Sequence, residues 1–290
     1  MSEFMNTLMN DLKSKKDLKD TTVKNYIRSL KIANCGENFT SLAFLNKKAQ
    51  VEECISEYKD GSKKSILTAI CSVLKLRSNE KLYKHYFDKL MSYNQPPSNE
   101  KTETQKENWI EWEDVLKIKE QYALKNDTQE NRLKSMVLSL YTEMQPRRVL
   151  DYICMYVVPK LKADLSTDKN YLALKENVFV FNKYKTDKKY GQQVIEIPTQ
   201  LRASINKYLA KHPLRDQAIY PFLINMANEP FKGSNSITMM LNRIFKRKVS
   251  ASMLRHIFLT QKYGDNLKER QNDSEVMGHS LAEQANYVKY

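Results

Sequence analysis

The sequence predicts a mostly α-helical protein with a small antiparallel β-sheet, divided into two folded parts by a polar linker. Helical periodicity dominates residues 1–93, where apolar side chains recur three and four positions apart. Residues 94–107 follow as the linker, because they contain Pro96 and Pro97 and almost no apolar side chain. Residues 108–290 form the second part, in which three short β-type runs interrupt further helices.

Two apolar sets mark the helices of the first part, and each follows a plausible helix cap. Thr21-Thr22 stand directly before Val23, and Ser62 stands before the run that begins at Ile66, so we expect these hydroxyl side chains to cap their helices. The two sets are Leu12, Val23, Tyr26, Ile27 and Leu30, and Ile66, Ala69, Ile70, Val73 and Leu74.

The second part begins with a helix near Trp109 and then alternates between helix and strand patterns. An apolar run, Leu150–Val158, suits either a strand or a helix. The other expected helices are Leu133–Tyr141, ending near Pro146, and then Leu201–Leu209, Ile237–Phe245 and Ser252–Gln261, with a polar loop over Lys268–Ser274. The expected strands are Tyr171–Leu174, Val178–Phe181 and Gln193–Ile197, which together predict a three-stranded antiparallel sheet.

Composition excludes several classes of protein. The 6 glycines are too scattered to form a phosphate-cradling loop or a dinucleotide fingerprint, so no nucleotide cofactor is expected. The 4 cysteines stand singly without metal-ligand spacing, which predicts no metal site and favours a reducing compartment. The longest uncharged run, Gln217–Asn228, is too short to span a membrane, and the N-terminus has no apolar signal core. We therefore expect an intracellular protein that needs no cofactor and has no membrane partner.

The chain carries a large excess of positive charge, with 48 Lys and Arg residues against 34 Asp and Glu residues and a net charge of +14. Both parts of the chain share this excess, so it is not confined to a basic tail. Basic surface on two folded parts suits a polyanion, because each neutralised phosphate releases a counterion. The charge therefore favours a nucleic acid as the partner.

Five short motifs in the second part follow one another in a suggestive order. They are Arg148 with Asp151 three positions later, Lys185-Thr186 after the run Val178–Phe181, Arg255 in Ser252-Met253-Leu254-Arg255-His256, Gly278-His279, and Tyr287. The turn at Tyr190-Gly191 and the returning run Val194–Pro198 place Lys185 in a β-hairpin. Arg255 lies on an apolar helix, where an arginine needs an anionic partner.

In these motifs the sequence resembles the tyrosine recombinases, the integrase-type enzymes that break and rejoin DNA. The resemblance covers most of residues 105–290 and, more weakly, the helical N-terminal part. It implies that residues 1–93 form a core-binding domain that clamps DNA and that residues 108–290 form the catalytic domain. It also implies a homo-oligomer, a tetramer on paired sites, and a strand transfer that requires neither metal nor ATP.

The resemblance assigns the nucleophile and the charge stabilisers. Tyr287 would attack the phosphodiester and form a 3′-phosphotyrosine ester, which stores the bond energy for rejoining. Its proton must leave during attack, because the ordinary pKa of tyrosine is about 10. Arg148 and Arg255 would stabilise the charge that develops on the phosphorane, because guanidinium groups are always charged and donate paired hydrogen bonds.

The remaining roles follow from the same resemblance. Lys185 would give a proton to the departing 5′-oxygen, and His279 would hydrogen-bond the scissile phosphate. Asp151 would orient Arg148 from behind. Ser252 stands where the family has histidine, and its hydroxyl either donates to the phosphate or caps its helix.

Several residues compete for these roles. Arg147 also precedes Asp151, but the offset of three positions favours Arg148, so we expect Arg147 to bind the DNA backbone. Three other lysines rival Lys185, namely Lys183, Lys188 and Lys189. We expect Lys188 and Lys189 to lie in the turn, where they would touch the DNA backbone. Tyr290 rivals Tyr287, which fits the spacing after His279. We interpret His256 as a structural residue that packs or hydrogen-bonds within its helix.

Site-specific recombination is therefore the leading hypothesis. A type IB topoisomerase, which relaxes DNA as a monomer with similar residues, is the first alternative. A DNA-binding relative with weakened catalysis is the second, because Ser252 departs from the family pattern.

Overall fold

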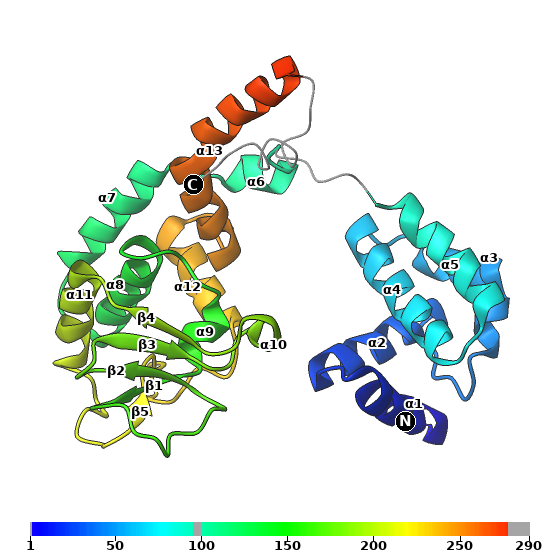
Figure 1. The fold of residues 1–290 in the computed structure, drawn as a ribbon, viewed down its shortest axis with the longest axis horizontal. Helices are drawn as coiled ribbons and strands as arrows, with labels where there is room; N and C mark the ends of the chain where they lie inside the picture. Colours follow the sequence, from blue (N-terminus) through cyan, green and yellow to red (C-terminus); the bar gives the residue numbers. More distant parts are fainter. Residues whose placement is uncertain (1, 95–99, 278–290) are drawn as a thin grey trace. The chain divides into compact units, whose positions relative to one another are not determined.

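The computed structural model describes residues 2–94 and 100–277 (Figure 1). It confirms the predicted fold class, because the chain is mostly helical with one small sheet. The chain divides into two compact units, Met1–Glu100 and Lys101–Tyr290, and each unit has its own hydrophobic core. Among the described helices, none combines the length and the apolar character needed to cross a bilayer.

The first unit is helical throughout its regular structure. Its elements are α1 (Glu3–Lys16), α2 (Asp20–Ala33), the 3₁₀ turn η1 (Ala43–Asn46), α3 (Lys48–Ile55), α4 (Asp60–Leu76) and α5 (Glu80–Ser92). The core is built around α4, which packs against both α2 and α5 and thereby buries its apolar residues. The predicted periodic sets are confirmed, since Val23, Ile27 and Leu30 face this core together with the apolar residues of α4.

Both predicted caps in the first unit are wrong. Helix α2 begins at Asp20 and α4 begins at Asp60, so Thr21-Thr22 and Ser62 lie inside the first turns. An acidic side chain in the first turn is favoured by the positive end of the helix dipole, which explains the earlier starts.

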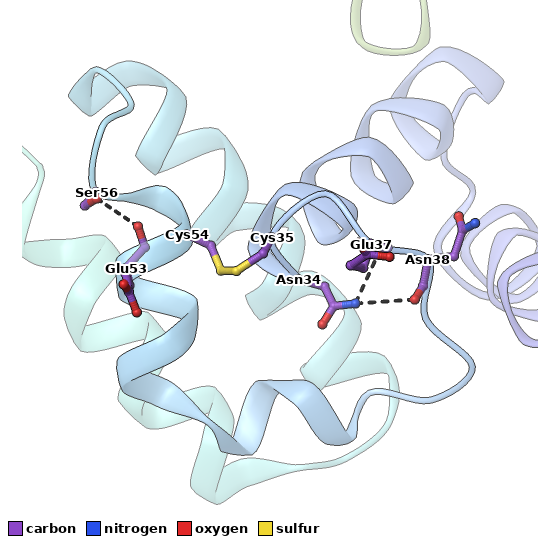
Figure 2. Close-up of a disulfide and its surroundings, with 7 residues drawn as sticks. All are labelled: Asn34, Cys35, Glu37, Asn38, Glu53, Cys54 and Ser56. Carbon is purple, nitrogen blue, oxygen red and sulfur yellow. Dashed lines mark hydrogen bonds between the residues drawn. A yellow bond between two sulfur atoms is a disulfide. The ribbon is translucent and has the colours of Figure 1, made fainter.

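A disulfide joins Cys35, in the turn after α2, to Cys54 near the end of α3 (Figure 2). The Cα atoms of the two residues are 4.9 Å apart, whereas the residues are separated by 19 positions in the sequence. The expectation of a reducing compartment rested on singly scattered cysteines, and the fold brings two of them together. The other two, Cys71 and Cys154, are free thiols.

We expect reduction of the Cys35–Cys54 bond to lower the free energy of unfolding of the first unit by about 3 kcal/mol, because a closed loop of this length restricts the unfolded chain. Chemical denaturation of the full chain, with and without reductant, measures the effect by far-ultraviolet circular dichroism. Tryptophan fluorescence is the internal control, because both tryptophans, Trp109 and Trp112, belong to the second unit. The Cys154→Ser variant should behave as wild type. Equal circular dichroism curves in both conditions would contradict a stabilising disulfide.

The sheet of the second unit has five strands in the order β4-β3-β2-β1-β5 (Figure 1). The strands are β1 (Met155–Val158), β2 (Asn170–Ala173), β3 (Val178–Phe181), β4 (Gln193–Glu196) and β5 (Tyr220–Pro221). The three predicted strands are β2, β3 and β4, and their antiparallel pairing is confirmed. The sheet is mixed rather than purely antiparallel, because β1 pairs parallel to β2 and β5 pairs antiparallel to β1.

Helices pack around this sheet. They are α6 (Glu103–Asn108), α7 (Trp112–Ala123), α8 (Gln129–Thr142), α9 (Val149–Ile153), α10 (Asp187–Tyr190), α11 (Thr199–Leu209), α12 (Asn235–Phe245) and α13 (Ala251–Met277). The run Leu150–Val158, which suited a strand or a helix, divides between α9 and β1. Every residue of β2 and β3 is buried, whereas β4 alternates, as expected for an edge strand with one covered face.

Two of the sequence predictions at the ends of the second unit need correction. Residues 94–107 were expected to be a linker, but α6 occupies part of this range and begins with a capping box between Thr102 and Gln105. Residues Lys268–Ser274 were expected to form a loop, yet they continue α13. In Figure 1 the second half of α13 extends away from the rest of its unit. The side chains of residues 261–273 are mostly exposed, so their polar composition reflects exposure and not a break in the helix.

Candidate active site

Arg148 lies at the start of α9, where the chain turns from α8 toward the sheet. Pro146 cannot donate a backbone hydrogen bond, so the helical chain breaks between Thr142 and Val149. Tyr152 anchors α9, because its buried ring packs edge-on against Phe179 and Phe181 of β3 at centroid distances of 6.1 and 6.2 Å. Arg148 is half-buried, and its side chain makes no hydrogen bond or ion pair with the described part of the chain.

Asp151 lies on α9 with only 2% of its surface exposed. One carboxylate oxygen, Oδ2, accepts a hydrogen bond from Arg147 Nε at 3.0 Å. The other oxygen, Oδ1, is buried and has no partner among the described residues. Burial raises the pKa of the Asp151 carboxyl, while the guanidinium groups of Arg147, Arg148 and Arg255 act to lower it. Three arginines therefore lie within electrostatic range of one buried carboxylate.

The structure pairs Asp151 with Arg147 and not with Arg148. Arg147 precedes Asp151 by four positions, and its side chain is only 16% exposed. Its Nη1 donates to Gln193 Oε1 at 2.9 Å, and its guanidinium lies 3.8 Å from the centroid of the Phe181 ring. Arg147 is thus held by protein groups, whereas the Arg148 side chain has no described partner. Contact of Arg147 with the DNA backbone stays a prediction.

Arg255 lies in the first two turns of α13. Met253, Leu254 and Ile257 are buried and hold this part of the helix in the core, while Arg255 is half-buried. Burial raises the pKa of Tyr141, on α8, well above its usual value, and the Arg255 guanidinium acts in the opposite direction. The Arg255 side chain has no hydrogen bond or ion pair within the described ranges. The start of α13 therefore brings Arg255 toward the end of α8 and toward Asp151.

Ser252 does not cap α13. The Oγ of Ser250 accepts from Met253 N at 3.2 Å, so Ser250 supplies the cap, while Ser252 is exposed. This leaves the Ser252 hydroxyl available to a ligand. His256, which we interpreted as a packing or hydrogen-bonding residue, is also exposed.

Lys185 lies in the connection between β3 and β4, which spans residues 182–192. The strand β3 ends at Phe181, as predicted, and the connection contains α10 where the sequence predicted a simple turn at Tyr190-Gly191. Lys185 is exposed. Its rival Lys183 forms an ion pair with Asp168, in which Nζ and Oδ1 are 3.4 Å apart. This ion pair distinguishes Lys183 from Lys185. Lys188 and Lys189 lie on α10 and are exposed, as predicted for the turn.

Asn170, which the sequence analysis did not single out, is fully buried at the start of β2. Its Nδ2 donates to the carbonyl oxygens of Asp151 and Lys183, each at 2.9 Å. Its Oδ1 accepts from the backbone N–H groups of Asn182 and Lys183 at 2.9 and 2.8 Å. One amide side chain therefore joins α9 to the loop that carries Lys185. An asparagine at the start of an apolar run was the available signal, because a polar side chain in a fully buried strand requires such partners.

The proposed nucleophile and the proposed phosphate-binding histidine lie outside the described residues. These are Tyr287 and His279, together with the rival Tyr290. The described part of the site therefore consists of α9, the start of α13 and the loop between β3 and β4.

Arg148 and Arg255 do not line a cavity of the second unit that lies between α7, α8 and α11. This cavity has a volume of about 280 Å³ and contains the ion pair of Lys119 and Glu143, whose Nζ and Oε1 atoms are 2.7 Å apart. None of Arg148, Asp151 or Arg255 lines it. A ligand of the arginine cluster therefore approaches a different surface from a ligand of this cavity.

Comparisons with known proteins add the following. No family model matches the sequence, and no curated protein matches it. Among solved structures, the chain is similar to a crystal structure of XerA recombinase, at 13% sequence identity and a TM-score of 0.39. The match covers 99% of this chain and 93% of that chain.

Proposed function

We propose that this protein is a site-specific tyrosine recombinase, which cleaves and rejoins double-stranded DNA through a 3′-phosphotyrosine intermediate. The observation that carries the proposal is the pair Arg148 and Arg255. They come from helices far apart in the sequence, both are half-buried, and both act on the buried Asp151 carboxylate. Neither has a partner within the described residues. Half-buried guanidinium groups without partners favour an anionic ligand, and two of them suit a phosphodiester.

The chemistry follows from the charge that develops on phosphorus. The Tyr287 oxygen attacks the phosphorus atom while its proton passes to solvent, the bond to the 5′-oxygen breaks, and the phosphate remains on the enzyme as an ester. Arg148 and Arg255 stabilise the additional negative charge of the transition state. Lys185 gives a proton to the departing 5′-oxygen, and His279 and Ser252 hydrogen-bond the phosphate. Rejoining reverses these steps, so the bond energy is conserved without a cofactor.

The positive charge of both units supports a DNA partner. Each unit carries an excess of Lys and Arg, so each supplies phosphate contacts of its own. Exchange of strands requires two duplexes, and we propose a tetramer on paired sites for this step. The exposed Lys188 and Lys189 on α10 supply contacts to the backbone beside the site.

Covalent trapping tests the proposal. A pool of duplexes of random sequence, each with a nick close to its centre, is incubated with the protein, and the products are denatured in detergent. The short strand released by cleavage next to the nick diffuses away, so rejoining fails. We expect a covalent protein–DNA adduct in the absence of metal and ATP. The recovered sequences then supply the substrate for further assays.

Two other results would replace the proposal with an alternative function. Relaxation of supercoiled plasmid by a monomer, without strand exchange between duplexes, would identify a topoisomerase. Binding of DNA without any adduct would identify a relative that has lost catalysis. Ser252→His would then be the first variant to test, because the family has histidine at this position.

A further inference from the structure

The loop that carries Lys185 is exposed at its tip but held by buried contacts at its base. Within the loop, Tyr184 is buried, and its hydroxyl donates to the Gly191 carbonyl at 2.7 Å. Gln192 Nε2 also donates to Asn182 Oδ1, at 2.6 Å. These bonds close the loop on itself, but they do not fix its position relative to Arg148.

Two side chains link the loop to α9. Arg147 reaches from the residue before Arg148 to both strands of the hairpin, because it stacks on Phe181 of β3 and donates to Gln193 of β4. Its guanidinium also lies 5.2 Å from the centroid of the Tyr184 ring. At the same time its Nε donates to Asp151. Arg147 therefore contacts α9, the two strands that flank the loop, and Tyr184 within the loop.

Asn170, at the start of β2, makes the second link. Its amide nitrogen donates to the Asp151 carbonyl of α9 and to the Lys183 carbonyl, and its amide oxygen accepts from the backbone of the loop. Both of its polar atoms are thus saturated within the protein. The loop cannot shift relative to α9 without breaking these hydrogen bonds, which is costly because the Asn170 amide is fully buried and would be left without water.

We propose that Arg147 and Asn170 are positioning residues that fix Lys185 relative to Arg148. The inference rests on the proposed function, because it concerns the proton donor of that reaction. Arg148 must act on the charged oxygens of the phosphate while Lys185 acts on the departing 5′-oxygen of the same phosphate, so their separation must be held constant. The buried links through Arg147 and Asn170 supply this constraint, while the exposed Lys185 side chain stays free to meet its ligand.

The Arg147→Lys variant tests this role. Lysine retains the positive charge but loses the planar fork that binds Asp151 and Gln193 together. We expect DNA affinity close to that of wild type and cleavage slower by about 10²-fold, because a small misplacement of a reacting group has an effect of this size. A substrate with sulfur in place of the 5′-oxygen should restore the rate, because a thiolate leaves without a proton; thiols have a pKa near 8.5. The matched control is Arg202→Lys, at an exposed arginine of α11.

Amide hydrogen exchange supplies a readout that does not depend on cleavage. Arg147→Lys and Asn170→Ser should both accelerate exchange over residues 182–192, while exchange in β2 and α8 stays as in wild type. Unchanged exchange in this loop would overturn the positioning role even in an active enzyme. Equal loss of rate on the oxygen and sulfur substrates would also overturn the positioning role. Weaker DNA binding with a smaller salt dependence would overturn it too and would make Arg147 a phosphate contact. If the wild type cleaves neither substrate, the proposed function fails, and the exchange experiment alone decides the link.

Discussion

The Arg148→Ala and Arg255→Ala variants are expected to bind DNA with nearly wild-type affinity and to cleave it at least ~10²-fold more slowly. The two guanidinium groups lie near one buried carboxylate and have no partner within the described residues. We therefore expect the two guanidinium groups to stabilise the negative charge that develops on the phosphate in the transition state. The rate of cleavage is measured under single-turnover conditions on a duplex with a sequence recovered in the trapping experiment. A filter-binding titration with the same duplex gives the affinity.

Arg202→Ala is the matched control for the arginine variants, because Arg202 is an exposed arginine of the same unit. It should leave both measurements unchanged. Equal losses of affinity and rate in Arg148→Ala and Arg255→Ala would show that these arginines anchor the DNA backbone and do not stabilise the transition state.

The Lys185→Ala variant is expected to reduce the rate of cleavage by about 10²- to 10⁴-fold, which is the usual contribution of a general acid. The loss should be confined to substrates with an oxygen leaving group. With sulfur at the 5′ position, Lys185→Ala should cleave at nearly the wild-type rate, because the sulfur leaves as a thiolate. The measurement is a pair of single-turnover rates for the two substrates.

Lys183→Ala is the matched control for Lys185→Ala. Lys183 lies two positions earlier in the same loop but pairs with Asp168, so its removal should affect both substrates equally and weakly. A selective rescue of Lys183→Ala by the sulfur substrate would transfer the role of proton donor to Lys183.

Apolar periodicity was sufficient to predict most helices and the three antiparallel strands. The sets around Ile27 and Ile70 form the core of the first unit, and the strands β2, β3 and β4 lie where β-type runs were found. The strands β1 and β5 were harder to predict. The strand β1 continues an apolar run that begins as α9, and β5 has only two residues, so neither has a pattern of its own.

The missed contacts are those that depend on tertiary structure. Cys35 and Cys54 become neighbours because α2 and α3 pack together, and spacing along the chain does not show this. Arg147 was set aside because an offset of three positions favoured Arg148, yet the bond to Asp151 spans four positions, one helical turn. Asn170 carries its role only through partners on two other elements. Sequence order therefore identified candidate residues of the site, whereas the links between them required the structure.

The most direct test of the account is to locate the covalent bond to DNA. Wild-type protein is trapped on the nicked duplex and digested with protease, and the peptide that retains a nucleotide is identified by mass spectrometry; Tyr287→Phe and Tyr290→Phe are treated in parallel. We predict that the nucleotide is attached to Tyr287, that Tyr287→Phe binds DNA without forming an adduct, and that Tyr290→Phe forms one normally. An adduct that persists in Tyr287→Phe, or a wild-type protein that binds the duplex and never becomes attached to it, would contradict the account.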